Sequence, residues 1–127
     1  MIYKNEETDA VNLFESEIVK ILFDKGEGNH ITFIIDWSEC DEEIRLVCNY
    51  CTGYRSEINT LECYSNFLCT GFLITAFSYK KTSGGYIVQI NFDLLVRGFI
   101  KFKCDDFFIE TESEPFQQGG NDNLIEN

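Results

Sequence analysis

The residues best suited to chemistry in this sequence are carboxylates gathered in one acidic stretch. Paired carboxylates perform acid–base catalysis when burial raises the pKa of one of them. They ligate calcium when they follow the D-x-D-x-D-G spacing, which this stretch lacks. No nucleophile–base pair accompanies them, so we expect no enzyme, and the stretch is either a solvated loop or a surface that binds a partner. Its members are Asp36, Glu39, Asp41, Glu42 and Glu43.

Thiol chemistry is the second possibility that the sequence raises, because the chain holds six cysteines and one histidine. The segment 48–51 is a lone CxxC, and a structural zinc site requires a second closely spaced pair, which Cys63 and Cys69 do not form. His30 is isolated from all of them in the sequence. We therefore expect reduced, buried cysteines that behave as small hydrophobic residues, with no metal and no cofactor. A metal-binding protein built on these cysteines is the less favoured alternative.

Composition and charge limit the class of protein. The chain has 127 residues with 22 acidic and 10 basic side chains, a formal net charge of −12, and 44% of its residues are hydrophobic. This length and hydrophobic content are typical of a single domain with a real core. The charge argues against nucleic acids and anionic membranes as partners, since these attract clustered Lys and Arg.

The N-terminal residues and the apolar runs bear on the cellular location of the protein. Residues 1–17 hold one Lys and five acids, unlike a secretory signal. No run approaches the roughly 20 apolar residues that a membrane span needs. We therefore expect a cytoplasmic protein.

Apolar residues alternate with polar ones along most of the chain, and this period of two indicates β-strands. In 17–24, for example, Val19, Ile21 and Phe23 are expected on one face and Lys20 on the other. The predicted strands are 17–24, 30–37, 44–50, 57–64, 72–80, 86–92 and 99–104, the last extended through 107–111 past a bulge at Asp105-Asp106.

Sequential strands with short links pair mostly as antiparallel neighbours. We therefore expect a mainly β protein with little helix, in which an antiparallel meander of about six or seven strands forms a sandwich or a partly open barrel. The same patterns divide the chain into three regions. These are an acidic N-terminal arm or short helix over 1–16, a single β domain over 17–112 and a flexible acidic C-terminal tail over 113–127.

Three runs of residues resemble the small immunity proteins of bacterial polymorphic-toxin and contact-dependent inhibition systems. They are 13–21 (LFESEIVKI), 85–93 (GYIVQINFD) and 98–107 (GFIKFKCDDF), and the similarity covers 13–110 as a hydrophobic rhythm. The opening segment of that family carries His-Asp where this chain has Phe14-Glu15, so no functional residue is carried over. The resemblance implies a cytoplasmic, non-enzymatic protein that binds and neutralises a cognate protein toxin.

A nuclease toxin has a basic cleft for phosphates, and an acidic protein can fill such a cleft with carboxylates. The partner surface that we expect therefore combines acidic residues with two aromatic anchors. The alternative function is an acidic accessory or interaction domain that assembles with itself through exposed strand edges. The residues expected at the partner surface are Trp37, Glu39, Asp41, Glu42, Glu43, Tyr50, Asp105 and Asp106.

Overall fold

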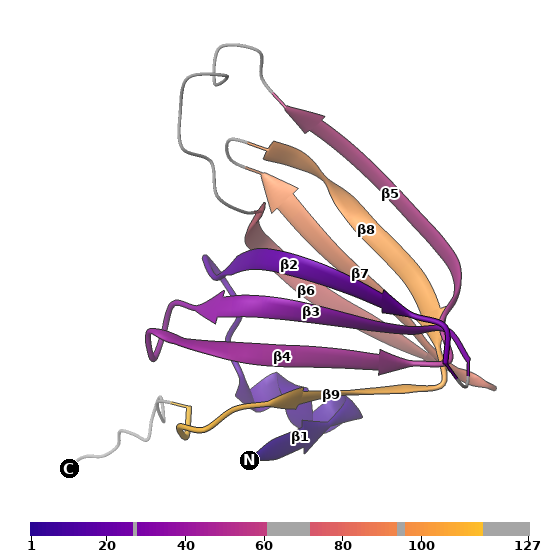
Figure 1. Ribbon diagram of the computed structural model, residues 1–127, viewed down its shortest axis with the longest axis horizontal. Coiled ribbons are helices and arrows are strands. Elements are labelled where there is room, and N and C mark those ends of the chain that lie inside the picture. The colour runs from indigo at the N-terminus through magenta and orange to yellow at the C-terminus, as the bar shows by residue number, and fades with distance from the viewer. Residues whose placement is uncertain (27, 61–71, 94–95, 116–127) are drawn as a thin grey trace.

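The computed structural model describes residues 1–26, 28–60, 72–93 and 96–115 and shows a mainly β protein (Figure 1). Nine strands form one antiparallel sheet in the order β1-β9-β4-β3-β2-β6-β7-β8-β5. The described residues also contain a short 3₁₀ helix, η1 (Asn5–Ala10). Among these residues, no helix has the length and apolar character needed to cross a membrane. The strands are β1 (Ile2–Lys4), β2 (Glu17–Asp24), β3 (His30–Trp37), β4 (Glu42–Asn49), β5 (Thr52–Thr60), β6 (Phe72–Thr82), β7 (Gly85–Asp93), β8 (Val96–Cys104) and β9 (Asp106–Glu110).

The predicted class, mainly β with little helix, is confirmed, and the sheet is open and does not close into a barrel. β4 shows how the sequence produces a strand. Ile44, Leu46 and Cys48 are buried, whereas Glu43 and Arg45 at the alternate positions are exposed. Because successive side chains of a strand point to opposite faces, this alternation fixes which face turns toward the core.

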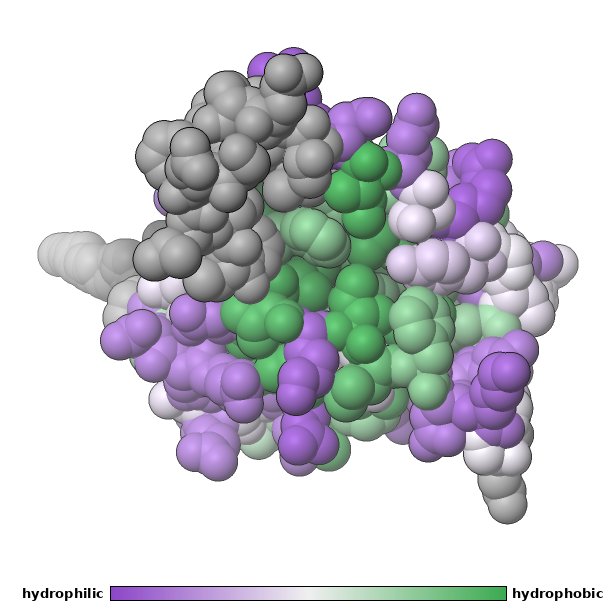
Figure 2. Space-filling model, turned by 45° about the horizontal axis from the view of Figure 1, so that its top comes forward, coloured by the Kyte–Doolittle hydropathy of each residue, from purple (hydrophilic) through white to green (hydrophobic). Residues whose placement is uncertain are grey.

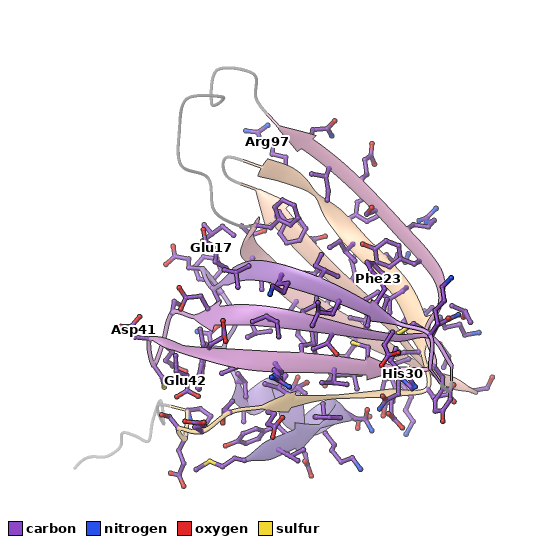
Figure 3. The ribbon with its side chains drawn as sticks, in the orientation of Figure 1. Glu17, Phe23, His30, Asp41, Glu42 and Arg97 are labelled. Atoms are coloured by element: carbon purple, nitrogen blue, oxygen red, sulfur yellow. The ribbon has the colours of Figure 1, made fainter. Side chains whose placement is uncertain are left out.

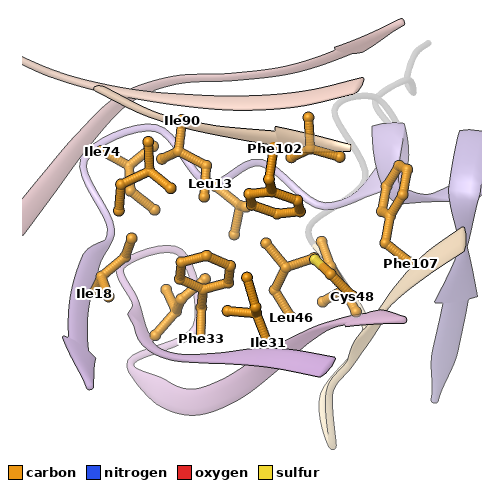
Figure 4. Packing of buried hydrophobic residues seen from close by; sticks show 14 of the residues in the cluster. Leu13, Ile18, Ile31, Phe33, Leu46, Cys48, Ile74, Ile90, Phe102 and Phe107 are labelled. Carbon is orange, nitrogen blue, oxygen red and sulfur yellow. The ribbon is translucent and has the colours of Figure 1, made fainter. Parts of the chain in front are cut away.

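The sheet folds over at the junction of β2 and β6, where only two residue pairs join the strands. The strands on either side form two halves, β1-β9-β4-β3-β2 and β6-β7-β8-β5, which fan apart in Figure 1. Phe33 of β3 stacks on Phe102 of β8 with 6.0 Å between ring centroids. Figure 4 shows buried side chains of both halves meeting in the space between them. The core therefore lies between two halves of one bent sheet.

β2 departs from the regular period of two. The residue pairs with β3 shift register between Ile18 and Lys20, so Val19 is an extra residue in the strand. Ile18 takes the core position at 2% exposure, and Val19 is 40% exposed. The expectation that Val19 shares the buried face with Ile21 is wrong for this reason: a bulge shifts the phase of the alternation.

The number and order of the strands differ from the predicted meander of six or seven. The chain meanders only within β2-β3-β4 and β6-β7-β8, while β5 lies beside β8 and β9 lies beside β4. The chain crosses from one half to the other at Asp105, between β8 and β9. Residues 106–110 are therefore a separate strand and not an extension of β8 past a bulge. A bulge and a crossing leave the same polar interruption in a sequence, and only the packing distinguishes them.

The N-terminal residues pack against the rest of the sheet. β1 pairs with β9, and the Phe107 N–H donates to Asn5 Oδ1 over 3.0 Å. Val11 and Leu13 are buried in the core. β1 escaped the sequence analysis because three residues are too few to display a period.

Candidate functional site

The acidic stretch lies at one end of β2, β3 and β4. The turn 38–41 joins β3 to β4 there, and the Asp41 N–H donates to Trp37 O over 2.8 Å. Asp41 has a φ of 55°, a left-handed conformation that Asp tolerates better than most residues, and its side chain is exposed. Figure 3 shows Glu17, Asp41 and Glu42 together at this end of the strands.

Three carboxylates lie side by side across these strands. Glu17 of β2 is paired with Asp36 of β3, and Asp36 is paired with Glu43 of β4. Directly opposite residues of antiparallel strands have Cβ atoms about 4.5–5.5 Å apart, and like charges at this spacing repel each other. Asp36 and Glu43 are exposed, so a cationic group of another molecule can approach both. We call Glu17, Asp36 and Glu43 the acidic row.

Glu42 has a different role from its neighbours. Its carboxylate accepts hydrogen bonds from the backbone N–H groups of Glu112 (2.8 Å) and Ser113 (3.3 Å). Hydrogen bonds from Ser113 and Glu112 hold the pKa of Glu42 below its ordinary value. Glu42 therefore ties the chain that follows β9 to the start of β4. Glu39, by contrast, is half-buried, and its Oε1 atom has no hydrogen-bond partner among the described residues.

The other three predicted surface residues lie at the opposite end of β4. Tyr50 is exposed and its ring is 4.9 Å from that of His30. Asn49 Nδ2 donates to Asp106 Oδ1 over 2.7 Å, and the Asp105 N–H donates to Asn49 O over 2.9 Å. The eight residues of β4 separate the two ends by about 23 Å, at roughly 3.3 Å per residue. The structure therefore divides the predicted surface into two separate acidic areas.

Trp37 is not available as a surface anchor. Its side chain is 0% exposed and belongs to the core, and its indole Nε1–H donates to Asn12 O over 2.9 Å. A buried Trp needs such a partner for its N–H group. Trp37 thus holds the N-terminal segment against β3, and proximity to the acidic loop in sequence did not place it at the surface.

Three of the described cysteines form part of the core. Cys48, Cys51 and Cys104 are buried, and Cys51 Sγ–H donates to Cys48 O over 3.4 Å. Burial raises the pKa of Cys48 well above its ordinary value and raises the pKa of Cys51 to about 12. Both thiols are therefore protonated at neutral pH and are weak nucleophiles. Within the described residues no three His, Cys, Asp or Glu side chains group to hold a metal ion. Cys63 and Cys69 lie outside those residues.

The sequence analysis missed an apolar area between the end of β2 and the start of β5. Phe23 is 60% exposed and packs edge-on against Tyr54, with 5.3 Å between the ring centroids. Both rings border a cavity of about 240 Å³ that His30 and Ile31 also line. Figure 2 shows apolar side chains gathered in the middle of the view. The period of two assigns Phe23 to the inner face, but it does not reveal that the side chain stays exposed there.

Comparisons with protein families, with curated proteins and with solved structures find no match for this chain.

Proposed function

We propose that this protein is a non-enzymatic binding protein that neutralises a cognate bacterial toxin through the acidic row at the ends of β2, β3 and β4. The observation that carries the proposal is the pairing of Asp36 with Glu43, two exposed carboxylates directly opposite each other on neighbouring strands. Glu17 extends the row on the other side of Asp36. The repulsion between Asp36 and Glu43 weakens the free sheet and is relieved when a basic group binds between these two carboxylates.

An arginine of the partner suits this position. Its planar guanidinium presents several N–H donors that can reach two neighbouring carboxylates at once. The net charge of −12 extends the attraction beyond the contact itself, because it draws a basic partner toward the protein and speeds their encounter.

The resemblance to immunity proteins supports a toxin as the partner. A nuclease domain is the toxin class that fits best, because its substrate-binding cleft is lined with basic groups that hold phosphates. Carboxylates of the acidic row, with the exposed Asp41 beside them, would take the place of those phosphates and block access of the substrate.

The division of the acidic residues into two areas makes the proposal more specific than the sequence allowed. Asp36, Asp41 and Glu43 are the contacts we expect, whereas Glu42 is engaged in holding the chain after β9. Asp105 and Asp106 lie at the far end of β4 and form a separate area. A toxin domain that covers the acidic row needs no contact with that second area.

The test is affinity capture from the native cell with three baits: the wild type, Glu43→Lys and Asp105→Lys. The two variants change the net charge equally and alter exposed side chains at opposite ends of β4. We expect the wild type and Asp105→Lys to retain a basic protein that Glu43→Lys loses. If the carboxylate is central in the complex, the loss corresponds to about 2–5 kcal/mol of binding free energy.

The captured protein is then titrated with the wild type in an activity assay. We expect inhibition that is complete at one equivalent and an association rate constant that falls as salt is added. Equal capture by all three baits would exclude the acidic row as the contact surface. Failure to inhibit any activity of a captured protein would exclude toxin neutralisation.

A further inference from the structure

In the part of the chain that the structure describes, β5 is an edge strand of the sheet. It ends the strand order, and β8 is the only described strand that pairs with it. Its nine residues contrast with the three of β1, the strand at the opposite edge. Every side chain described in β5 is exposed. Long edge strands with free N–H and C=O groups are templates for pairing with a further strand, so the sequence of β5 should reveal what it pairs with.

The residues in the middle of β5 are complementary to themselves when the strand is reversed. Arg55, Ser56 and Glu57 read plus, neutral, minus in one direction and minus, neutral, plus in the other. We propose that β5 pairs antiparallel with β5 of a second copy of this chain, with Ser56 opposite Ser56 on a twofold axis. The result is an isologous dimer whose two sheets are continuous across the interface.

The charges select this register. With Ser56 on the axis, Arg55 of each copy lies opposite Glu57 of the other, and two cross-strand ion pairs form. Two neighbouring registers also keep the inner faces of both sheets on the same side. One places Arg55 opposite itself and the other places Glu57 opposite itself, so each opposes like charges directly. The alignment centred on Ser56 avoids both repulsions.

Apolar contacts strengthen the same alignment. Tyr54 and Ile58 lie two residues on either side of Ser56 and are 37% and 38% exposed. In the dimer each Tyr54 lies opposite Ile58 of the second copy, and aromatic–β-branched pairs are among the favourable cross-strand pairs. Tyr54 already stacks against Phe102, with 6.3 Å between ring centroids, so the new contact continues an existing aromatic layer.

The net charge opposes association, because each copy carries −12. This repulsion acts over long distances and is screened by salt, with a Debye length of about 10 Å at 0.1 M. The hydrogen bonds and apolar contacts of the paired strands are short-range and persist when salt is added. We therefore expect the dimer to strengthen as salt is added.

Sedimentation equilibrium of the wild type and three charge variants tests the register. We expect Arg55→Glu and Glu57→Arg each to raise the dimer dissociation constant about tenfold or more, because each variant turns two attractive pairs into repulsive ones. The double variant Arg55→Glu/Glu57→Arg restores opposite charges in the mirrored arrangement and should recover the wild-type constant. Recovery in the double variant also shows that the single variants fold.

Cysteine substitution at the twofold axis gives an independent test of the proposed register. Paired antiparallel residues have Cα atoms about 4.5–5.5 Å apart, within the range that a disulfide spans. We expect Ser56→Cys to form a covalent dimer on oxidation, whereas the wild type and Asn59→Cys, whose new thiol lies three residues from the axis, do not. A wild type that stays monomeric at high salt and millimolar concentration, or a Ser56→Cys variant that links no faster than Asn59→Cys, would overturn the proposal.

Discussion

Gly85, the first residue of β7, and Gly84, in the turn between β6 and β7, have very different surroundings. A Cβ atom on Gly85 would lie 2.2 Å from the Cys104 carbonyl oxygen, at a φ of +151° that other residues rarely adopt. A Cβ atom on Gly84 would meet no atom within 4 Å. The first position therefore requires glycine, and the second does not.

Replacement of each glycine by alanine tests this difference. We expect Gly85→Ala to lower the free energy of unfolding by about 2–3 kcal/mol, because the backbone of β7 must move away from β8. Gly84→Ala should change it by less than about 0.5 kcal/mol. Urea unfolding of both variants measures the two effects. Equal destabilisation by both substitutions would mean that the close approach of Gly85 to Cys104 does not exist.

Glu42 should make stability depend on pH in a defined direction. Its pKa is lower in the folded protein than the ordinary value of 4.5, so its contribution is fully present above the unfolded pKa. The contribution is lost as the pH falls through the lower, folded pKa. We expect Glu42→Gln to cost about 1 kcal/mol at pH 7, because a charge-assisted hydrogen bond becomes a neutral one at a partly exposed site. The difference from the wild type should disappear in acid.

Glu43→Gln is the matched control for Glu42→Gln, since it removes the same charge from the adjacent residue. Glu43 is exposed and opposite Asp36, so its neutralisation removes a repulsion. We expect this variant to be as stable as the wild type or slightly more stable at pH 7. Chemical unfolding at pH 7 and at pH 3 distinguishes the two variants. A Glu43→Gln variant that loses as much stability as Glu42→Gln would contradict the separate roles given to these residues.

At the scale of the strands, the packing of β3 against β8 holds the two halves of the sheet together. Phe33 is 0% exposed and stacks on Phe102. Leu22, in the neighbouring strand β2, is 46% exposed. A large buried side chain contributes through both its removal from water and its contacts, whereas an exposed one contributes little.

Alanine substitutions of these two residues measure that packing. We expect Phe33→Ala to lower the free energy of unfolding by about 3–5 kcal/mol and Leu22→Ala by less than about 1 kcal/mol. Thermal and urea unfolding followed by tryptophan fluorescence are suitable, because Trp37 lies in the same strand as Phe33. A small effect of Phe33→Ala would show that the halves of the sheet are stable without facing each other.

For the molecule as a whole, the net charge of −12 acts on two separate surfaces. The acidic row uses the charge to attract a basic partner, and added salt weakens that attraction. The β5 edge has to overcome the same charge to pair with a second copy, and added salt assists it. Opposite responses to salt therefore separate toxin binding from self-association in one set of measurements. The two surfaces involve different strands, so one protein can use both.

The class of the fold could be predicted from the sequence alone. The alternation of apolar and polar residues predicted β3 with its observed bounds and β4, β6, β7 and β8 to within three residues at either end. The prediction succeeds because the period of two is a local property. The apolar or polar character of each residue indicates the face of the strand on which it lies. The weak pattern after Thr52 predicted β5 later than it lies, since exposure on both faces removes the alternation.

The neighbours of β1, β5 and β9 and the junction of β2 with β6 could not be predicted, because these pairings join residues distant in the sequence. The acidic row lies across three consecutive strands of the predicted meander, but the sequence does not indicate the register that sets Glu17 opposite Asp36 and Asp36 opposite Glu43. The separation of Asp105 and Asp106 from the acidic row has the same origin, as does the burial of Trp37. Net charge and periodicity can be read from the sequence residue by residue. The composition of a surface depends on how the sheet bends and which strands it brings together.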